Sequence, residues 1–245
     1  MHQVLERIAH QKLEFSRRPL FAFLRDTSIP PRERLSFLPL MSHFIMSFGD
    51  LNRYVLRFPE PRNALEEAVN LHTREDENHW PWFLNDLEAL ELNGPRTLTH
   101  HLRQLWSDDT APARRLTYTL AGCIRGTSAL QRWVLIEVME ETGNVMFRAL
   151  TPVAKELEEA EGLRLEFAGS LHLSHETGHA VGFDVDHSGL LEARLTPRER
   201  APLLSMVDAS HAAFSEFVDA LYRATPRGRR TAELPGLRAT SPAAT

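Results

Sequence analysis

The sequence predicts an all-helical, single-domain protein, and three observations support this fold class. Nearly every segment carries apolar residues at the three- and four-residue spacing of an α-helix, and no stretch alternates convincingly with the period of two of a β-strand. Breaks that contain proline or glycine separate these segments. The chain has 245 residues, of which 42% are hydrophobic, so it can bury one sizeable core.

The first half of the chain divides into four predicted helices. The first covers about residues 2–26 and ends before Ser28-Ile29-Pro30-Pro31. The second, about 31–57, begins with a proline that suits a first helical turn. The third runs from near residue 61 to the stop signal at 93–95, with a kink or break at Pro81, because proline removes a backbone hydrogen bond. Residues 96–106 suggest a short fourth helix.

The second half predicts helices over about 111–124 and 126–158, and Gly162 separates the latter from a helix that contains residues 172–179. Thr196 can cap the last helix, with Pro197 in its first turn, and this helix ends near Arg223. We therefore assign residues 1–223 to one domain. Residues 224–245, rich in Arg, Pro, Gly and Ala, are expected to form a disordered tail.

Composition excludes several classes of function. The net charge of −5 argues against a sequence-independent nucleic-acid surface. Cys123 is the one cysteine, which excludes an internal disulfide and any cysteine-based zinc or iron–sulfur site. No run approaches eighteen apolar residues, and charges stand where a signal peptide needs an apolar core, so we expect a cytoplasmic protein without a membrane partner.

A pattern typical of metal ligands occurs twice, at residues 72–79 (H-T-R-E-D-E-N-H) and 172–179 (H-L-S-H-E-T-G-H). Each copy has His at i, a carboxylate at i+4 and His at i+7, and the first copy adds Glu75 at i+3. On a helix these positions lie on one face. Two such helices facing each other would direct imidazoles and carboxylates into a shared volume, as in the carboxylate-bridged metal sites of helical bundles. The candidate ligands are His72, Glu75, Asp76, His79, His172, Glu176 and His179.

A third source of carboxylates lies within the helix predicted over 126–158. Glu137, Glu140 and Glu141 interrupt an otherwise apolar stretch, and periodicity does not choose among them. Burying an uncompensated carboxylate is costly, and a metal ion is one reason to keep one there. Imidazole and carboxylate ligands suit Fe(II), Mn(II) or Zn(II).

The second motif resembles the H-x3-D/E-x2-H signature of the haem-oxygenase-like diiron oxidases and oxygenases, with Glu176 where that family more often has Asp. The phrase H-Q-K-L-E-F-S-R-R-P-L-F-A-F-L also looks like the first helix of the haem oxygenase/TenA-like superfamily. The family takes one Glu ligand from a middle helix, which matches Glu137 or Glu140. It often has a Glu seven residues before the His that corresponds to His79, but here that position is His72, so Glu75 or Asp76 would supply the carboxylate.

The resemblance covers most of residues 5–222 in element order. It implies a bundle of seven or eight helices around a central pocket that holds two iron ions. If the resemblance holds, Phe44, Phe48 and Trp133 would line this substrate pocket. It further implies that O2 is a co-substrate for oxidation of a small molecule, such as an amino-acid or fatty-acid derivative, and it suggests a homodimer.

Three other readings of the same residues stay open. The superfamily also contains haem proteins, which would use His10 as the haem ligand. It contains metal-free TenA- or PqqC-like enzymes as well. In such an enzyme, or in a ligand-binding helical protein, the His and Glu side chains would contact an organic molecule directly. The third reading is a buried hydrogen-bonded network that only fixes the packing of the core.

Overall fold

The computed structural model describes the main chain of residues 1–95, 97–179 and 194–233, and the side chains of these residues except 175–179 and 232–233. All regular elements in these ranges are helical, which confirms the predicted fold class. In chain order they are α1 (His2–Ser16), α2 (Pro19–Leu24), α3 (Pro31–Arg34), the 3-10 turn η1 (Leu38–Met41), α4 (Ser42–Asp50), the π-helical turn η2 (Leu51–Leu56), α5 (Ala64–Asp76), α6 (Trp80–Ala89), α7 (Leu98–Leu105), α8 (Ala111–Ile124), α9 (Ala129–Glu161), α10 (Ser170–His179), α12 (Pro197–Ala224) and α13 (Pro226–Glu233).

Two of the predicted helices are divided, in each case close to a proline. The segment 2–26 becomes α1 and α2, because Pro19 lacks an N–H and begins a new helix after Arg18. The segment 31–57 becomes α3, η1, α4 and η2, with Pro39 in the first turn of η1. The expected break near Pro81 is present, since α5 ends at Asp76 and α6 begins at Trp80.

Other predicted boundaries agree with the structure. Helix α8 has the expected bounds, and Gly162 ends α9 in the left-handed conformation, with φ of 68°, that favours glycine. Thr196 caps α12 through a capping box with Glu199. Local sequence signals are therefore sufficient to locate these helix ends.

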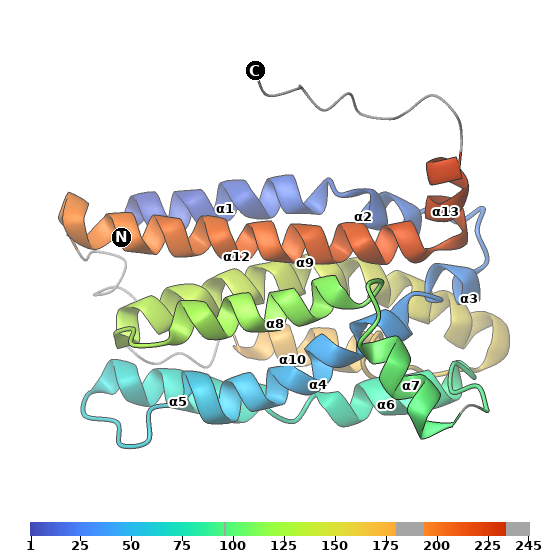
Figure 1. Cartoon of the computed structure of the whole chain (residues 1–245), viewed down its shortest axis with the longest axis horizontal. Helices are drawn as coiled ribbons and strands as arrows, with labels where there is room; N and C mark the ends of the chain where they lie inside the picture. Colours follow the sequence, from blue (N-terminus) through green and yellow to red (C-terminus); the bar gives the residue numbers. More distant parts are fainter. Residues whose placement is uncertain (96, 180–193, 234–245) are drawn as a thin grey trace.

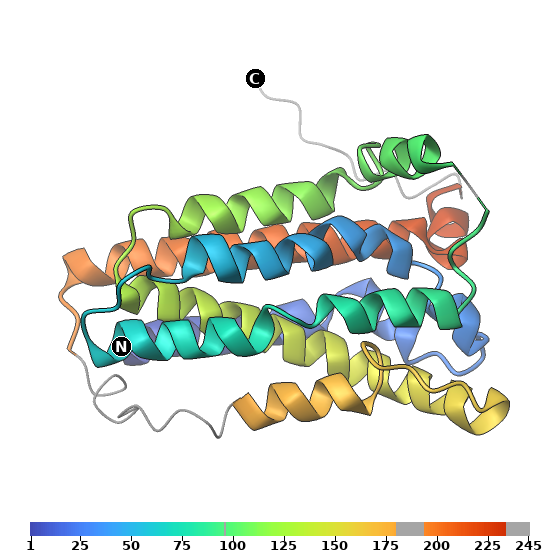
Figure 2. The same cartoon turned by 90° about the horizontal axis from the view of Figure 1, so that it is seen from below.

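Helix α9 is the central element of the bundle. It contacts α1 and α12 as well as α5 and α10. Figures 1 and 2 show α1 beside α12, with α4, α5 and α6 on the opposite side of the molecule. Helix α9 therefore borders both the hydrophobic core and the elements that carry the two motifs.

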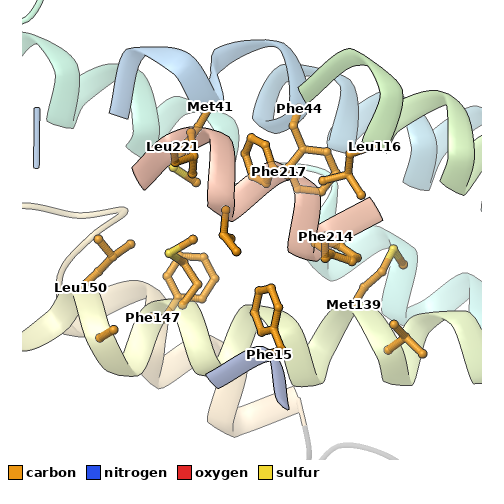
Figure 3. Packing of buried hydrophobic residues seen from close by; sticks show 14 of the residues in the cluster. Phe15, Met41, Phe44, Leu116, Met139, Phe147, Leu150, Phe214, Phe217 and Leu221 are labelled. Atoms are coloured by element: carbon orange, nitrogen blue, oxygen red, sulfur yellow. The ribbon is translucent and has the colours of Figure 1, made fainter. Parts of the chain in front are cut away.

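Aromatic side chains from several helices meet in the core (Figure 3). Phe15 of α1 lies edge-on to Phe214 of α12 at 6.5 Å, and Phe214 lies edge-on to Phe44 of α4 at 5.7 Å between ring centroids. Such pairs add to the free energy gained from burying apolar area. The core thus fixes α1, α4 and α12 around the middle of α9.

The beginning of the expected disordered tail is helical. Thr225 accepts a hydrogen bond from the N–H of Gly228 at 3.1 Å, and Pro226 begins α13, which packs against α12. Arg227 pairs with Asp26 and fastens this helix to the N-terminal region. The prediction of a disordered tail was wrong for residues 226–233, because composition alone does not reveal the helix cap at Thr225. The remaining tail, 234–245, lies outside the described residues.

In the described part of the chain, no helix has the length and apolar character needed to cross a bilayer.

Candidate metal site

Three side chains from two helices form a buried cluster with the composition of a metal site. Nε2 of His72 lies 2.9 Å from Oδ2 of Asp76 and 3.3 Å from Oε1 of Glu140. One potential ligand atom from each of the three lies within 4.8 Å of the others. His72 and Asp76 are buried and Glu140 is mostly buried, so the cluster is withdrawn from bulk water.

Helical periodicity brings these groups together. His72 and Asp76 are four residues apart on α5, so they share one face. That face lies against α9, where Glu140 is directed toward them. The neighbouring Glu141 points toward α1 instead and pairs with Lys12. The structure thus places Glu140, and not Glu141, beside His72 and Asp76.

The cluster concentrates negative charge around one imidazole. Burial alone would lower the pKa of His72, but Asp76 and Glu140 outweigh it and raise that pKa well above its ordinary value. Burial, aided by the charges of Glu140 and Glu141, raises the pKa of Glu137 to about 7. The carboxylates of Asp76 and Glu140 face one imidazole, and a third carboxyl group, that of Glu137, has a pKa of about 7. This concentration of carboxyl groups favours a cation at this position.

The second motif begins beside this cluster. The ring of His172 in α10 lies edge-on to that of His79, with centroids 4.7 Å apart, and His79 stacks on Trp82 at 4.8 Å. Phe147 of α9 packs on the other side of His172 at 3.8 Å. His79 and His172, from motifs a hundred residues apart in the chain, are therefore neighbours, as the repeated spacing predicted.

A cavity of about 80 Å³, the volume open to the centre of a water molecule, lies next to these groups. Asp76, His79, Glu140, Thr142 and His172 give it a polar edge. The rest of the wall is mainly aromatic and thioether, including Phe15, Met139, Met146, Phe147, Phe214 and Phe217, several of which converge in Figure 3. This is the form of a small-molecule site: apolar walls with a few convergent polar groups.

Not every predicted residue joins this arrangement. Phe44 and Phe48 line the cavity as expected. Trp133 is buried but is not among the residues that line this cavity, because the cavity borders α9 only from Met139 to Phe147, nearly two turns further on. Glu75 is exposed and lies outside the three-residue cluster, while Glu137 is close enough to interact electrostatically.

The side chains of Glu176 and His179 lie outside the described residues, although both belong to α10. His10 is exposed on α1 and is not among the residues lining the cavity, so the haem reading gains no support from its position.

Sequence reasoning missed several residues of the site. Gly143 lines the cavity about one turn after Glu140, and Thr142 lines it about one turn after Met139, so periodicity on α9 could have indicated both. Phe15, Phe214 and Phe217 come from helices at opposite ends of the chain. No local pattern distinguishes them from ordinary core residues.

No protein-family model matches this chain, and the search of curated proteins gave no match. The resemblance to haem-oxygenase-like oxidases therefore rests on the motif residues and stays a prediction.

Proposed function

We propose that this protein is a nonhaem dimetal oxidase or oxygenase, with two iron ions and O2 as co-substrate, that acts on a small molecule. The buried His72–Asp76–Glu140 cluster beside an apolar cavity carries this proposal. One imidazole and two carboxylates suit Fe(II), and such ligands in helical bundles hold pairs of ions.

His72, Asp76 and Glu140 would hold one ion, since their ligand atoms already lie close together. His79 and His172 lie at the edge of the same cavity and would serve the second ion, with Glu137, Glu176 and His179 as further candidates. Bound iron would supply the electrons and open coordination positions for activating O2.

The chain's own side chains would bind and orient the substrate. The aromatic and methionine wall excludes water and accepts an apolar part of the molecule. The polar edge directs the substrate's reacting end toward Asp76 and Glu140. The expected substrate is therefore a small organic molecule with an apolar portion.

Anaerobic loading with Fe(II), followed by desalting and metal analysis, tests the proposal. We expect about two irons per chain, as in dimetal helical bundles. Glu140→Gln should weaken binding by more than about tenfold, because it removes a charged ligand. Glu141→Gln is the matched control, because its carboxylate pairs with Lys12, and it should bind iron like the wild type.

A folded wild-type protein that retains no iron would overturn the proposal. A metal-free TenA- or PqqC-like enzyme would then be the better reading. One observation favours this alternative: His72, when protonated, already forms an ionic network with Asp76 and Glu140. Substrate-like ligands would in that case bind at unchanged affinity in the presence of a strong chelator.

A further inference from the structure

Asp86 of α6 is a buried carboxylate outside the proposed ligand set, and it is bonded to the main chain that precedes α10. Its Oδ1 accepts the N–H of Glu166 at 2.6 Å, and its Oδ2 accepts the N–H of Ala168 at 2.8 Å. The side chain is 1% exposed, so neither bond competes with bulk water. Hydrogen bonds to an ionised acceptor in such surroundings are strong.

The segment that Asp86 holds is tightly built. A Cβ on Gly169 would lie 2.0 Å from the carbonyl oxygen of Leu165, so this turn requires glycine. The ring of Phe167 is fixed between Phe83 of α6 and Phe147 of α9, at 5.2 and 5.3 Å between centroids. The Phe167–Ala168 peptide is therefore held by packing as well as by the carboxylate.

The same peptide unit contacts His172. The carbonyl of Phe167 and the N–H of Ala168 belong to one planar, conjugated amide. The Phe167 oxygen lies 3.1 Å from Nδ1 of His172. Because a carbonyl oxygen only accepts, Nδ1 carries the proton, and the lone pair of the neutral imidazole is on Nε2.

We propose that Asp86 is a positioning residue for His172, acting through the Phe167–Ala168 peptide to fix the Nδ1–H tautomer and the ring orientation. The arrangement is a carboxylate, a peptide and an imidazole in series. Histidines that bind metals usually donate their second N–H to a carboxylate or carbonyl, which sets the tautomer and raises the basicity of the ligating nitrogen. Here the peptide passes the polarisation from Asp86 to a His172 that lines the cavity.

The consequence for metal binding rests on the proposed function, whereas the consequence for the tautomer does not. The first measurement is therefore made on the metal-free wild-type protein. Long-range proton–nitrogen NMR of 15N-histidine-labelled protein at pH 8, with His172→Gln to assign the signal, should show the proton of His172 on Nδ1. A proton on Nε2 would overturn the inference without any Asp86 variant.

The second measurement compares Asp86→Asn with Asn85→Ala. Asn85 is the matched control, because it lies on the same helix and bonds to the Glu166 side chain of the same segment at 2.8 Å, but not to the peptide. Asp86→Asn should shift His172 toward the Nε2–H tautomer and weaken Co(II) binding by about tenfold, while Asn85→Ala changes neither. Circular dichroism establishes that each variant is folded.

The outcomes separate the two proposals. If Asp86→Asn is folded and leaves both the tautomer and Co(II) affinity unchanged, Asp86 has no positioning role, whatever the fate of the metal site. If the tautomer shifts but the wild type binds no metal, the positioning role stands and the proposed function fails.

Discussion

Replacing Glu137 by Gln should stabilise the metal-free protein at pH 8. The pKa of Glu137 is raised from 4.5 to about 7, first by burial and then by Glu140 and Glu141. Each pKa unit corresponds to 1.36 kcal/mol, so ionising this group costs about 3 kcal/mol more in the folded protein than in the unfolded chain. Its side chain keeps some exposure, which screens the charge, and we expect a gain of about 1–3 kcal/mol.

The pH dependence follows from the direction of the shift. The folded protein keeps this proton to a higher pH than the unfolded chain does. The free energy of unfolding therefore falls as the pH rises from 4.5 to about 7, and it stays low above that range. Glu137→Gln removes this loss, so its advantage at pH 5 should be below about 1 kcal/mol.

Urea unfolding of the metal-free proteins at pH 5 and pH 8 measures both values. Glu141→Gln is the control: its ion pair with Lys12 is partly exposed, so its removal should cost less than about 1 kcal/mol at either pH. Equal stabilisation of Glu137→Gln at the two pH values, or none at pH 8, would refute the argument that burial and the neighbouring carboxylates disfavour the ionised form of Glu137. Added Zn(II) should reverse the order, because a nearby cation favours the ionised form.

Three further changes test the fold. Burial lowers the pKa of His211 from 6.5 to about 4, so this group by itself removes about 2 kcal/mol of unfolding free energy between pH 7 and pH 5. In urea titrations, the unfolding free energy of His211→Gln should therefore rise by about 2 kcal/mol relative to that of the wild type over this range, and parallel pH profiles would contradict this. Arg34 is fully buried and donates hydrogen bonds to two main-chain carbonyls and to a carboxylate, so Arg34→Met should lower the unfolding free energy by about 3–5 kcal/mol in urea denaturation. The control Arg32→Met, at an exposed ion pair, should lower it by less than about 1 kcal/mol. Similar losses for the two variants would show that burial does not set the cost of removing the arginine. A Cβ on Gly49 would lie 2.8 Å from a main-chain oxygen, so Gly49→Ala should lower the unfolding free energy by about 1–3 kcal/mol in the same assay. A Cβ on Gly122 would meet open space, so the control Gly122→Ala should raise it by about 0.4–1 kcal/mol. No effect of Gly49→Ala would mean that the main chain shifts to accommodate the methyl group.

The sequence contains enough information for the fold class and for two of the three residues of the cluster. His72 and Asp76 share one helix, and their proximity follows from a four-residue spacing that no tertiary contact needs to create. Glu140 could not be separated from Glu137 and Glu141, because the choice depends on which side of α9 faces α5. That information lies in the packing of distant segments.

The errors in the helical boundaries have a common cause. Pro19 and Pro39 begin new helical elements inside segments whose apolar periodicity continues across them. Periodicity reports which face of a segment is buried, but it does not report whether the axis bends. The bonds of Asp86 are harder still to predict, because they join α6 to a turn far along the chain, and a single aspartate in a helix carries no local signal.

The thioethers in the cavity wall have a chemical consequence. Met139 and Met146 border the same space as Glu140, and sulfur is the most easily oxidised atom in such a wall. If iron here activates oxygen, turnover without a substrate would leave methionine sulfoxide at these two positions. Peptide mass spectrometry would then measure methionine oxidation as a record of turnover without substrate. A compound that occupies the cavity should lower this oxidation, so the decrease would rank compounds by how well they bind there.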